Sequence, residues 1–126
     1  MTNTLTCISP IDGSVFAERP VLSLDEAKSV AAKGRAAQAA WAARPLEERT
    51  RLVMAGVAAV GEMNDEIVPE LAHMMGRPVR FGGEFGGFNE RASYMAGIAE
   101  TALAPIEVGE DATFKRYIKR VPLGLV

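Results

Sequence analysis

The sequence of 126 residues contains only one cysteine, one histidine and one tryptophan. A single cysteine, Cys7, allows no internal disulfide, which fits a reducing compartment. The chain also lacks an apolar run of the ~18 residues that a membrane helix needs, and its first residues lack the features of a signal peptide. The net charge of −2 gives no excess of basic residues for nucleic acid or an anionic membrane. We therefore expect a cytoplasmic protein that binds neither nucleic acid nor a membrane.

Residue clusters that support catalysis are equally scarce. Cys7 has no histidine or basic neighbour in the sequence to activate it, so a half-buried strand position is the better interpretation. His73 stands alone, and one histidine makes neither a metal site nor a proton relay. The glycines at 82, 83, 86 and 87 do not match the dinucleotide-binding pattern G-x-G-x-x-G after a strand. The residues themselves thus predict no catalytic, cofactor-binding or metal-binding site.

Composition is that of a folded globular chain, with 48% apolar and 24% charged residues. A chain of this length suits one domain, residues 1–126, which would bury about two-thirds of the surface that the unfolded chain exposes.

Local signals predict the first two elements. Pro10 and Asp12-Gly13 favour a tight turn, so residues 4–20 should form a β-hairpin arm. Ser23 and Glu26 have the spacing of a capping box, which predicts a helix from Leu24 to about Ala43.

A second helix is expected to begin near Pro45, and a further segment to run from an N-cap at Asn64 to Met75. Pro69 lies inside this segment and should kink it or delay its start, while Gly76 should end it. Trp41, on the apolar stripe of the first helix, is expected to pack near Leu52 and Val53.

The third long helix should be firm only from Phe88 to Leu103, because glycines in the preceding residues each cost roughly 1 kcal/mol in a helix. Helices thus occupy residues 23–103. Residues 107–112 read as a polar link, and Thr113–Val121 as a strand. The fold class is therefore α+β, mainly α, with an N-terminal hairpin, three long helices of which the second is kinked, and a C-terminal strand.

Residues 112–126 make up an apolar strand followed by a new apolar run, Pro122–Val126. A strand with unpaired edges invites pairing with another chain. Basic residues in it alternate between its two faces, so edge lysines that discourage random pairing are preferred over a nucleic-acid site. We expect this chain to be the front of a longer protein.

Several short patterns occur in one order along the chain, and together they resemble the N-terminal portion of the aldehyde dehydrogenase superfamily. The patterns are Pro10-x-Asp12-Gly13, Trp41 with Arg49 and Leu52, Met75-Gly76-Arg77-Pro78, Tyr94-x-Ala96-x-x-Ala99, and Arg120-x-Pro122-x-Gly124.

The resemblance implies a partial aldehyde dehydrogenase fold that lacks the Rossmann-like and catalytic domains. Residues 112–126 would then lead toward the oligomerisation sheet and the cofactor domain. It also implies an oxidoreductase that converts an aldehyde to a carboxylic acid with NAD or NADP, although the nucleophile, general base and cofactor loop are missing from these residues. The isolated segment is expected to be inactive and to bind no cofactor.

By the same resemblance, Gly83, Gly87 and Phe88 would border the entrance for substrate, while close helix packing remains the alternative for these glycines. The implied partners are the remainder of the enzyme chain and a second copy, which would associate through the strand at 113–126. The alternative function is a self-standing helical interaction module derived from a truncated aldehyde dehydrogenase.

Overall fold

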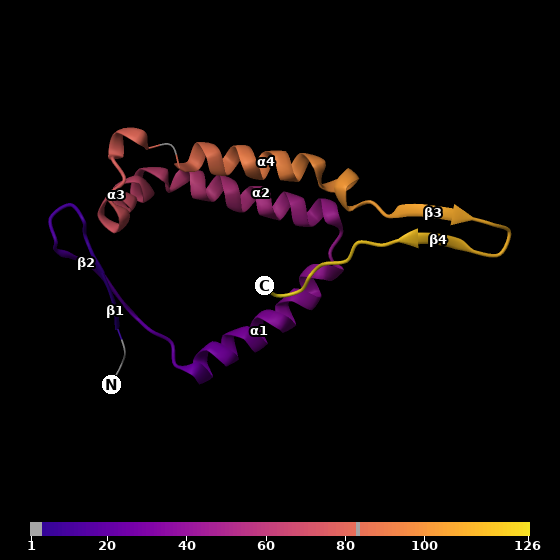
Figure 1. The fold of residues 1–126 in the computed structure, drawn as a ribbon, viewed down its shortest axis with the longest axis horizontal. Helices are drawn as coiled ribbons and strands as arrows, with labels where there is room; N and C mark the ends of the chain where they lie inside the picture. The colour runs from indigo at the N-terminus through magenta and orange to yellow at the C-terminus, as the bar shows by residue number, and fades with distance from the viewer. Residues whose placement is uncertain (1–3, 83) are drawn as a thin grey trace.

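The computed structural model describes residues 4–82 and 84–126. Within that part of the chain, four α-helices lie between two β-hairpins, and α2 and α4 run side by side in opposite directions (Figure 1). This arrangement confirms the mainly α fold with β elements at both ends. The elements are β1 (Thr4–Ile8), β2 (Val15–Pro20), α1 (Leu24–Ala43), α2 (Leu46–Glu62), α3 (Asn64–Met75), the short 3-10 helix η1 (Val79–Phe81), α4 (Glu84–Leu103), β3 (Ile106–Glu110) and β4 (Lys115–Ile118).

The first hairpin forms as its turn sequence predicts. Gly13 adopts φ of 76°, and the Asp12 carboxylate accepts hydrogen bonds from the hydroxyl of Ser14 at 2.7 Å and from its N–H at 3.0 Å. These bonds hold the pKa of Asp12 below its ordinary value. β1 and β2 pair antiparallel with a bulge between Cys7 and Ile8, and Cys7 is half-buried, as expected.

Helix α1 begins with the predicted capping box. Ser23 Oγ accepts the N–H of Glu26 at 3.3 Å, and the Glu26 carboxylate accepts the N–H of Ser23 at 2.7 Å. The helix ends at Ala43 because the next residue, Arg44, is extended ahead of Pro45. No residue of α1 is fully buried, which leaves most of the helix surface in contact with solvent.

The second helical region divides at Met63 into α2 and α3. α3 starts at Asn64, well before Pro69, so Pro69 does not delay the start of the helix. Pro69 lies in the middle of α3 and is exposed, although a proline there removes one backbone hydrogen bond of the helix. Asn64 is the first helical residue rather than the N-cap, and Met63 occupies the cap position without a side-chain bond. Gly76 ends α3 in the left-handed conformation, as expected.

Helix α4 begins at Glu84, so the expectation of a firm helix only from Phe88 is wrong. The ring of Phe85 packs against α2 at Gly61, where a Cβ atom would lie 2.5 Å from the ring's Cζ. This contact with a distant helix offsets the intrinsic cost of the neighbouring glycines.

The expectation of a polar link at 107–112 is also wrong, because Ile106–Glu110 forms β3 and pairs antiparallel with β4. The predicted strand at 113–121 shortens to Lys115–Ile118. Residues 119–126 carry no helix or strand, and the side chain of Leu125 instead packs on α1 at Gly34.

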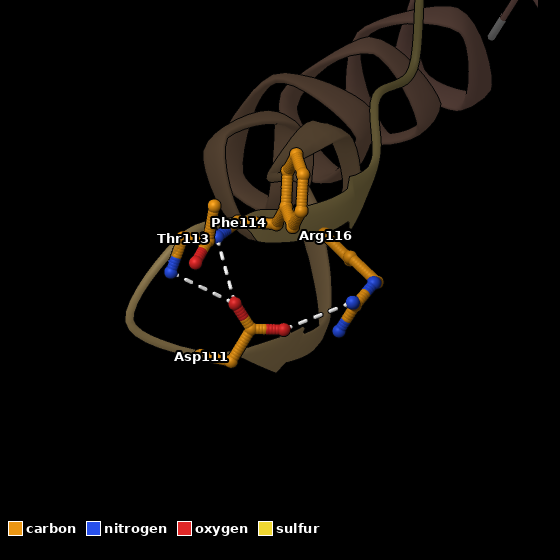
Figure 2. Close-up of polar contacts among 4 residues, drawn as sticks. All are labelled: Asp111, Thr113, Phe114 and Arg116. Atoms are coloured by element: carbon orange, nitrogen blue, oxygen red, sulfur yellow. Dashed lines mark hydrogen bonds and ion pairs between the residues drawn. The ribbon is translucent and has the colours of Figure 1, made fainter.

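Asp111 closes the turn between β3 and β4 (Figure 2). Its carboxylate accepts the N–H groups of Thr113 at 2.9 Å and Phe114 at 2.8 Å, and Arg116 donates to its other oxygen at 2.9 Å. These bonds, led by the one from Thr113, hold the pKa of Asp111 below its ordinary value. An aspartate that binds the backbone locally thus turns the polar sequence into a hairpin tip.

The core is small for the length of the chain. Among the described residues, only Val57 and Ala72 are buried apolar side chains, and the chain exposes 10158 Å². A compact monomer of 13.5 kDa exposes about 6,500 Å². The structure therefore does not reach the two-thirds burial that the length of the chain predicts, and about 3,700 Å² of surface is in excess.

Candidate functional site

The first half of α4 carries Gly87 and Phe88, two of the three residues that the family resemblance assigns to a substrate entrance. Gly87 faces open space, since a Cβ atom there would meet nothing within 4 Å. Phe88 is 48% exposed and borders a groove between α3 and α4. Gly83 lies outside the described residues. The open surroundings of Gly87 differ from the tight packing at Gly61, where α2 and α4 approach closely.

This groove, called the α3–α4 groove below, has a volume of about 380 Å³. α2 contributes the end of its apolar stripe, α3 contributes three apolar side chains, and two phenylalanines come from α4. Its lining residues are Val60, Asn64, Ile67, Leu71, Met75, Arg77, Glu84, Phe85 and Phe88. A groove of this kind suits an apolar group more than a charged one.

Three polar groups interrupt the apolar lining of the α3–α4 groove. Arg77 and Glu84 form an ion pair with both side chains partly exposed, so it adds little stability. Oδ1 of Asn64 is buried and has no hydrogen-bond partner among the described residues. Because Oδ1 is buried, the polar groups that the groove presents to solvent are those of Arg77 and Glu84.

His73 meets the first hairpin rather than a site open to solvent. Its ring stacks on Phe16 with centroids 4.8 Å apart and planes 5° from parallel. Nδ1 lies 3.3 Å from Oγ of Ser9, which is fully buried and also accepts the N–H of Ile11. Because solvent does not reach Ser9, this cluster fastens the hairpin to α3 and does not suit nucleophilic chemistry.

The described residues do not form the strand-and-helix arrangement in which a nicotinamide dinucleotide typically binds. Both sheets in residues 4–82 and 84–126 are two-stranded and antiparallel, whereas dinucleotides bind where a helix follows a strand of a parallel sheet. In the same part of the chain, no group of three or more histidine, cysteine or acidic side chains is placed to hold a metal ion. No helix described here combines the length and apolar character needed to cross a bilayer.

The basic residues near the C-terminus pair within their own segment. Lys115 contacts Glu107 at 2.6 Å, which raises the pKa of the lysine, and Arg116 contacts Asp111. Arg120 donates to the carbonyl of Ala104 at 2.7 Å. These contacts tie the second hairpin together and join it to the end of α4, while the role of the edge lysines in discouraging random pairing stays a prediction.

Sequence reasoning missed Asn64, Arg77 and Phe85 as groove residues. Phe85 stands between two pairs of glycines, and an aromatic residue in such a stretch is a signal for a close contact. Asn64 gave no usable signal, because only the packing of α2, α3 and α4 shows that its oxygen is buried without a partner.

Solved structures share this arrangement of helices and hairpins. The structure of PnpE in complex with nicotinamide adenine dinucleotide matches with a TM-score of 0.81 and 24% identity, over 96% of this chain and 25% of that chain. An NAD-dependent benzaldehyde dehydrogenase from Corynebacterium glutamicum matches with a TM-score of 0.77 and 23% identity, over 88% of this chain and 24% of that one. A putative aldehyde dehydrogenase from Burkholderia cenocepacia matches with a TM-score of 0.84 and 23% identity, over 96% of this chain and 25% of that one.

These matches show that the chain has the fold of one part of larger dehydrogenases. The model of the aldehyde dehydrogenase family matches residues 1–126, and the chain belongs to that family. It spans about a quarter of the length of the structures that it matches.

Proposed function

We propose that the chain is the N-terminal segment of an NAD-dependent aldehyde dehydrogenase, an oxidoreductase that converts an aldehyde to a carboxylic acid. The family match over all 126 residues supports the reaction class. NAD is preferred over NADP because two structural neighbours are described with NAD. We propose the cytoplasm as its location, which the single cysteine favours.

The observation that carries this proposal is the excess of exposed surface. About 3,700 Å² more is exposed than in a compact monomer of this mass, and large apolar side chains from every helix contribute to it. Many large apolar side chains that stay exposed mark an interaction surface. A segment that packs against three further quarters of an enzyme accounts for it.

The mass of the protein in its native cells tests the proposal. An antibody against residues 24–43 should detect a protein about four times the 13.5 kDa of this chain, because the chain spans 25% of its structural neighbour. A single band at 13.5 kDa would instead support the self-standing interaction module and overturn the enzyme proposal.

The isolated chain should neither oxidise aldehydes nor bind NAD or NADP. The reaction needs a thiolate, a base and a bound hydride acceptor, and the described residues do not bring such groups together. Calorimetric titration with NAD should show no binding. A dissociation constant tighter than about 100 μM, or roughly −5.5 kcal/mol, would show that a cofactor site exists in these residues.

We further propose that Gly83, Gly87 and Phe88 border the entrance for the aldehyde. The open space at Gly87 and the exposed Phe88 beside the α3–α4 groove support this assignment. In the enzyme of native length, Gly87→Leu should raise KM for benzaldehyde and leave KM for acetaldehyde nearly unchanged. Gly86→Leu is the matched control, since a Cβ there also meets nothing within 4 Å. Equal effects of the two substitutions would refute the assignment.

Association of two copies through residues 113–126 is the last part of the proposal. Every residue of β3 and β4 is exposed, and a two-stranded sheet leaves both of its edges unpaired. The hairpin also extends away from the helices (Figure 1), where a second copy would reach it.

Sedimentation equilibrium of the native-length protein tests this association. Ile118→Lys on β4 should shift it toward the monomer, whereas Thr6→Lys on the exposed first hairpin should not. An oligomer unaffected by Ile118→Lys would exclude β4 as its contact.

A further inference from the structure

A second groove lies where the end of α1 meets α2 and α4, and it has a volume of about 290 Å³. Trp41 and Val53 share this groove, as expected, while Leu52 does not line it. Nε of Arg49, another lining residue, is buried and has no hydrogen-bond partner in the described part of the chain. This groove and the α3–α4 groove are both lined by residues on the side of α4 that faces α2 and α3.

The opposite side of α4 carries Gly87, Arg91 and Tyr94. Phe85 meets α2, and Gly87, two residues further on, points about 200° around the helix from it. Spacings of four and three residues place Gly87, Arg91 and Tyr94 in one stripe along α4. A Cβ atom at Gly87 would meet nothing within 4 Å, and Tyr94 is 62% exposed. The stripe therefore runs from the proposed entrance along an open side of the helix.

Arg91 is the only basic residue of α4, and it is exposed. It forms no ion pair with a described residue, whereas Arg77 is paired with Glu84. Side chains on a helix lean toward its N-terminus, so the stem of Arg91 leans over the turn that carries Gly87 and Phe88. Because Gly87 has no side chain, this turn leaves room for a ligand group beside the guanidinium.

The neighbouring acidic residue, Glu90, faces a different direction. At about 100° per residue, Arg91 lies about 60° from Phe88 around the helix, whereas Glu90 lies about 160° from it. An anionic group between Gly87 and Phe88 would therefore be nearer to the guanidinium than to the carboxylate of Glu90.

The residues around Arg91 also indicate what the anionic group is attached to. Phe88 and Tyr94 lie three residues before and after Arg91, and both expose their aromatic rings. An aromatic ring packs favourably against such rings in an offset or edge-to-face arrangement. A guanidinium binds a carboxylate through two parallel N–H···O hydrogen bonds. The surface thus suits a ring that carries a carboxylate.

We propose that Arg91 determines substrate specificity and that the enzyme prefers aromatic aldehydes that carry a carboxylate on the ring. Arg91 donates two hydrogen bonds to the carboxylate, while Phe88 contacts the ring. This inference rests on the proposed function and on the entrance at Gly87 and Phe88. It adds the charge of the substrate and the residue that recognises it.

Two aldehydes of nearly the same shape test the preference for charge, 4-carboxybenzaldehyde and its neutral amide, 4-formylbenzamide. In the native-length enzyme, kcat/KM for the carboxylate should exceed that for the amide about fivefold or more, the upper end of what an exposed ion pair contributes. The difference should lie in KM rather than kcat, because the ion pair forms in the bound substrate and the transition state alike. A smaller ratio would overturn the inference.

Substitution of Arg91 tests whether its side chain causes the preference. Arg91→Gln should reduce the ratio of the two kcat/KM values to about one, and Arg91→Lys should keep only part of it, because an ammonium lacks the paired geometry. Arg51→Gln removes an exposed arginine of α2 and is the matched control, which should keep the full ratio. Both aldehydes are measured on one preparation, so the ratio does not depend on the amount of folded enzyme. A full ratio in Arg91→Gln would refute the role of Arg91.

The inference and the proposed function fail in different ways. A native-length protein that oxidises neither these two aldehydes nor benzaldehyde with NAD overturns both. A protein that oxidises benzaldehyde and the amide without preferring the carboxylate overturns the role of Arg91 alone.

Discussion

Two glycines of α2 allow the packing of α2 against α4 to be measured. A Cβ atom at Gly61 would lie 2.5 Å from Cζ of Phe85 and 2.9 Å from each of its Cε atoms. A Cβ atom at Gly56 would meet nothing within 4 Å. Both positions are helical, so alanine at Gly56 changes the helix alone, and alanine at Gly61 changes the helix and its contact with α4.

The two alanines should therefore act in opposite directions. Replacing glycine by alanine inside a helix gains about 0.5–1 kcal/mol, and less at Gly61, which lies next to the last helical residue. Forcing a methyl group into a packed contact costs about 1–3 kcal/mol. Because the Phe85 ring can tilt, we expect Gly61→Ala to be about 1–2 kcal/mol less stable than Gly56→Ala.

Amide hydrogen exchange of α2, read by mass spectrometry, measures this difference locally. A loss of 1–2 kcal/mol corresponds to about 5–30-fold faster exchange in Gly61→Ala than in Gly56→Ala. Phe85→Leu in the Gly61→Ala background removes the ring and should restore slow exchange. If Gly61→Ala exchanges as slowly as Gly56→Ala, then α2 and α4 do not meet at this contact.

Three further substitutions test other local contacts. Ser9→Ala should loosen the first hairpin from α3 by about 1–3 kcal/mol, since His73 loses its buried partner, and faster exchange of residues 4–20 would show it. Ser23→Ala should destabilise the start of α1 by about 1 kcal/mol, and a helix content that stays unchanged would argue against the cap. Asp111→Ala should open the tip of the second hairpin to proteolysis; cleavage no faster than in the unsubstituted chain would contradict the role of its carboxylate. Folding lowers the pKa of Glu26 and Asp111. Both carboxylates therefore stabilise the folded state fully above their ordinary pKa values of 4.5 and 3.8, and this stabilisation is lost as the pH falls through the lower values of the folded state. An acid titration by circular dichroism would follow the loss.

Features with a local cause could be predicted from the sequence. The turn at Gly13, the capping box at Ser23 and the helix end at Gly76 each depend on residues within a few positions. Their backbone conformations follow from side chains that bind the nearest N–H groups or from the freedom of glycine at positive φ. Such signals remain valid whatever the rest of the chain does.

Features with a distant cause could not be predicted. The start of α4 depends on the contact of Phe85 with Gly61, which lies on another helix. β3 pairs Ile106 with Ile118, and an irregularity between Glu107 and Gly109 interrupts the alternation that identifies a strand. Helix propensity correctly predicts that the glycines destabilise the start of α4. It does not include the contact between Phe85 and Gly61, which offsets this cost.

The residues of the candidate entrance could not be predicted from local sequence signals either. Gly87 and Phe88 came from the family resemblance, because nothing in glycine or phenylalanine alone indicates a substrate. The unpaired Asn64 Oδ1 and Arg49 Nε are visible only once three helices are packed. Buried polar atoms without partners are therefore the information that the structure adds, and both belong to residues that line grooves at helix contacts.

The mismatch between composition and burial explains why these unpaired atoms occur. A chain that is 48% apolar has enough apolar side chains for a full core, yet only Val57 and Ala72 are buried among the described residues. Folding a chain fixes its backbone at a cost of about 1–2 kcal/mol per residue, and burial on this small scale does not offset that cost. We therefore expect a polypeptide that covers Trp41, Val53 and Met95 to add stability to the helices. Stability measured on the 126 residues alone should consequently rise when the covering polypeptide is supplied, because a partner that binds only the folded form stabilises it by mass action.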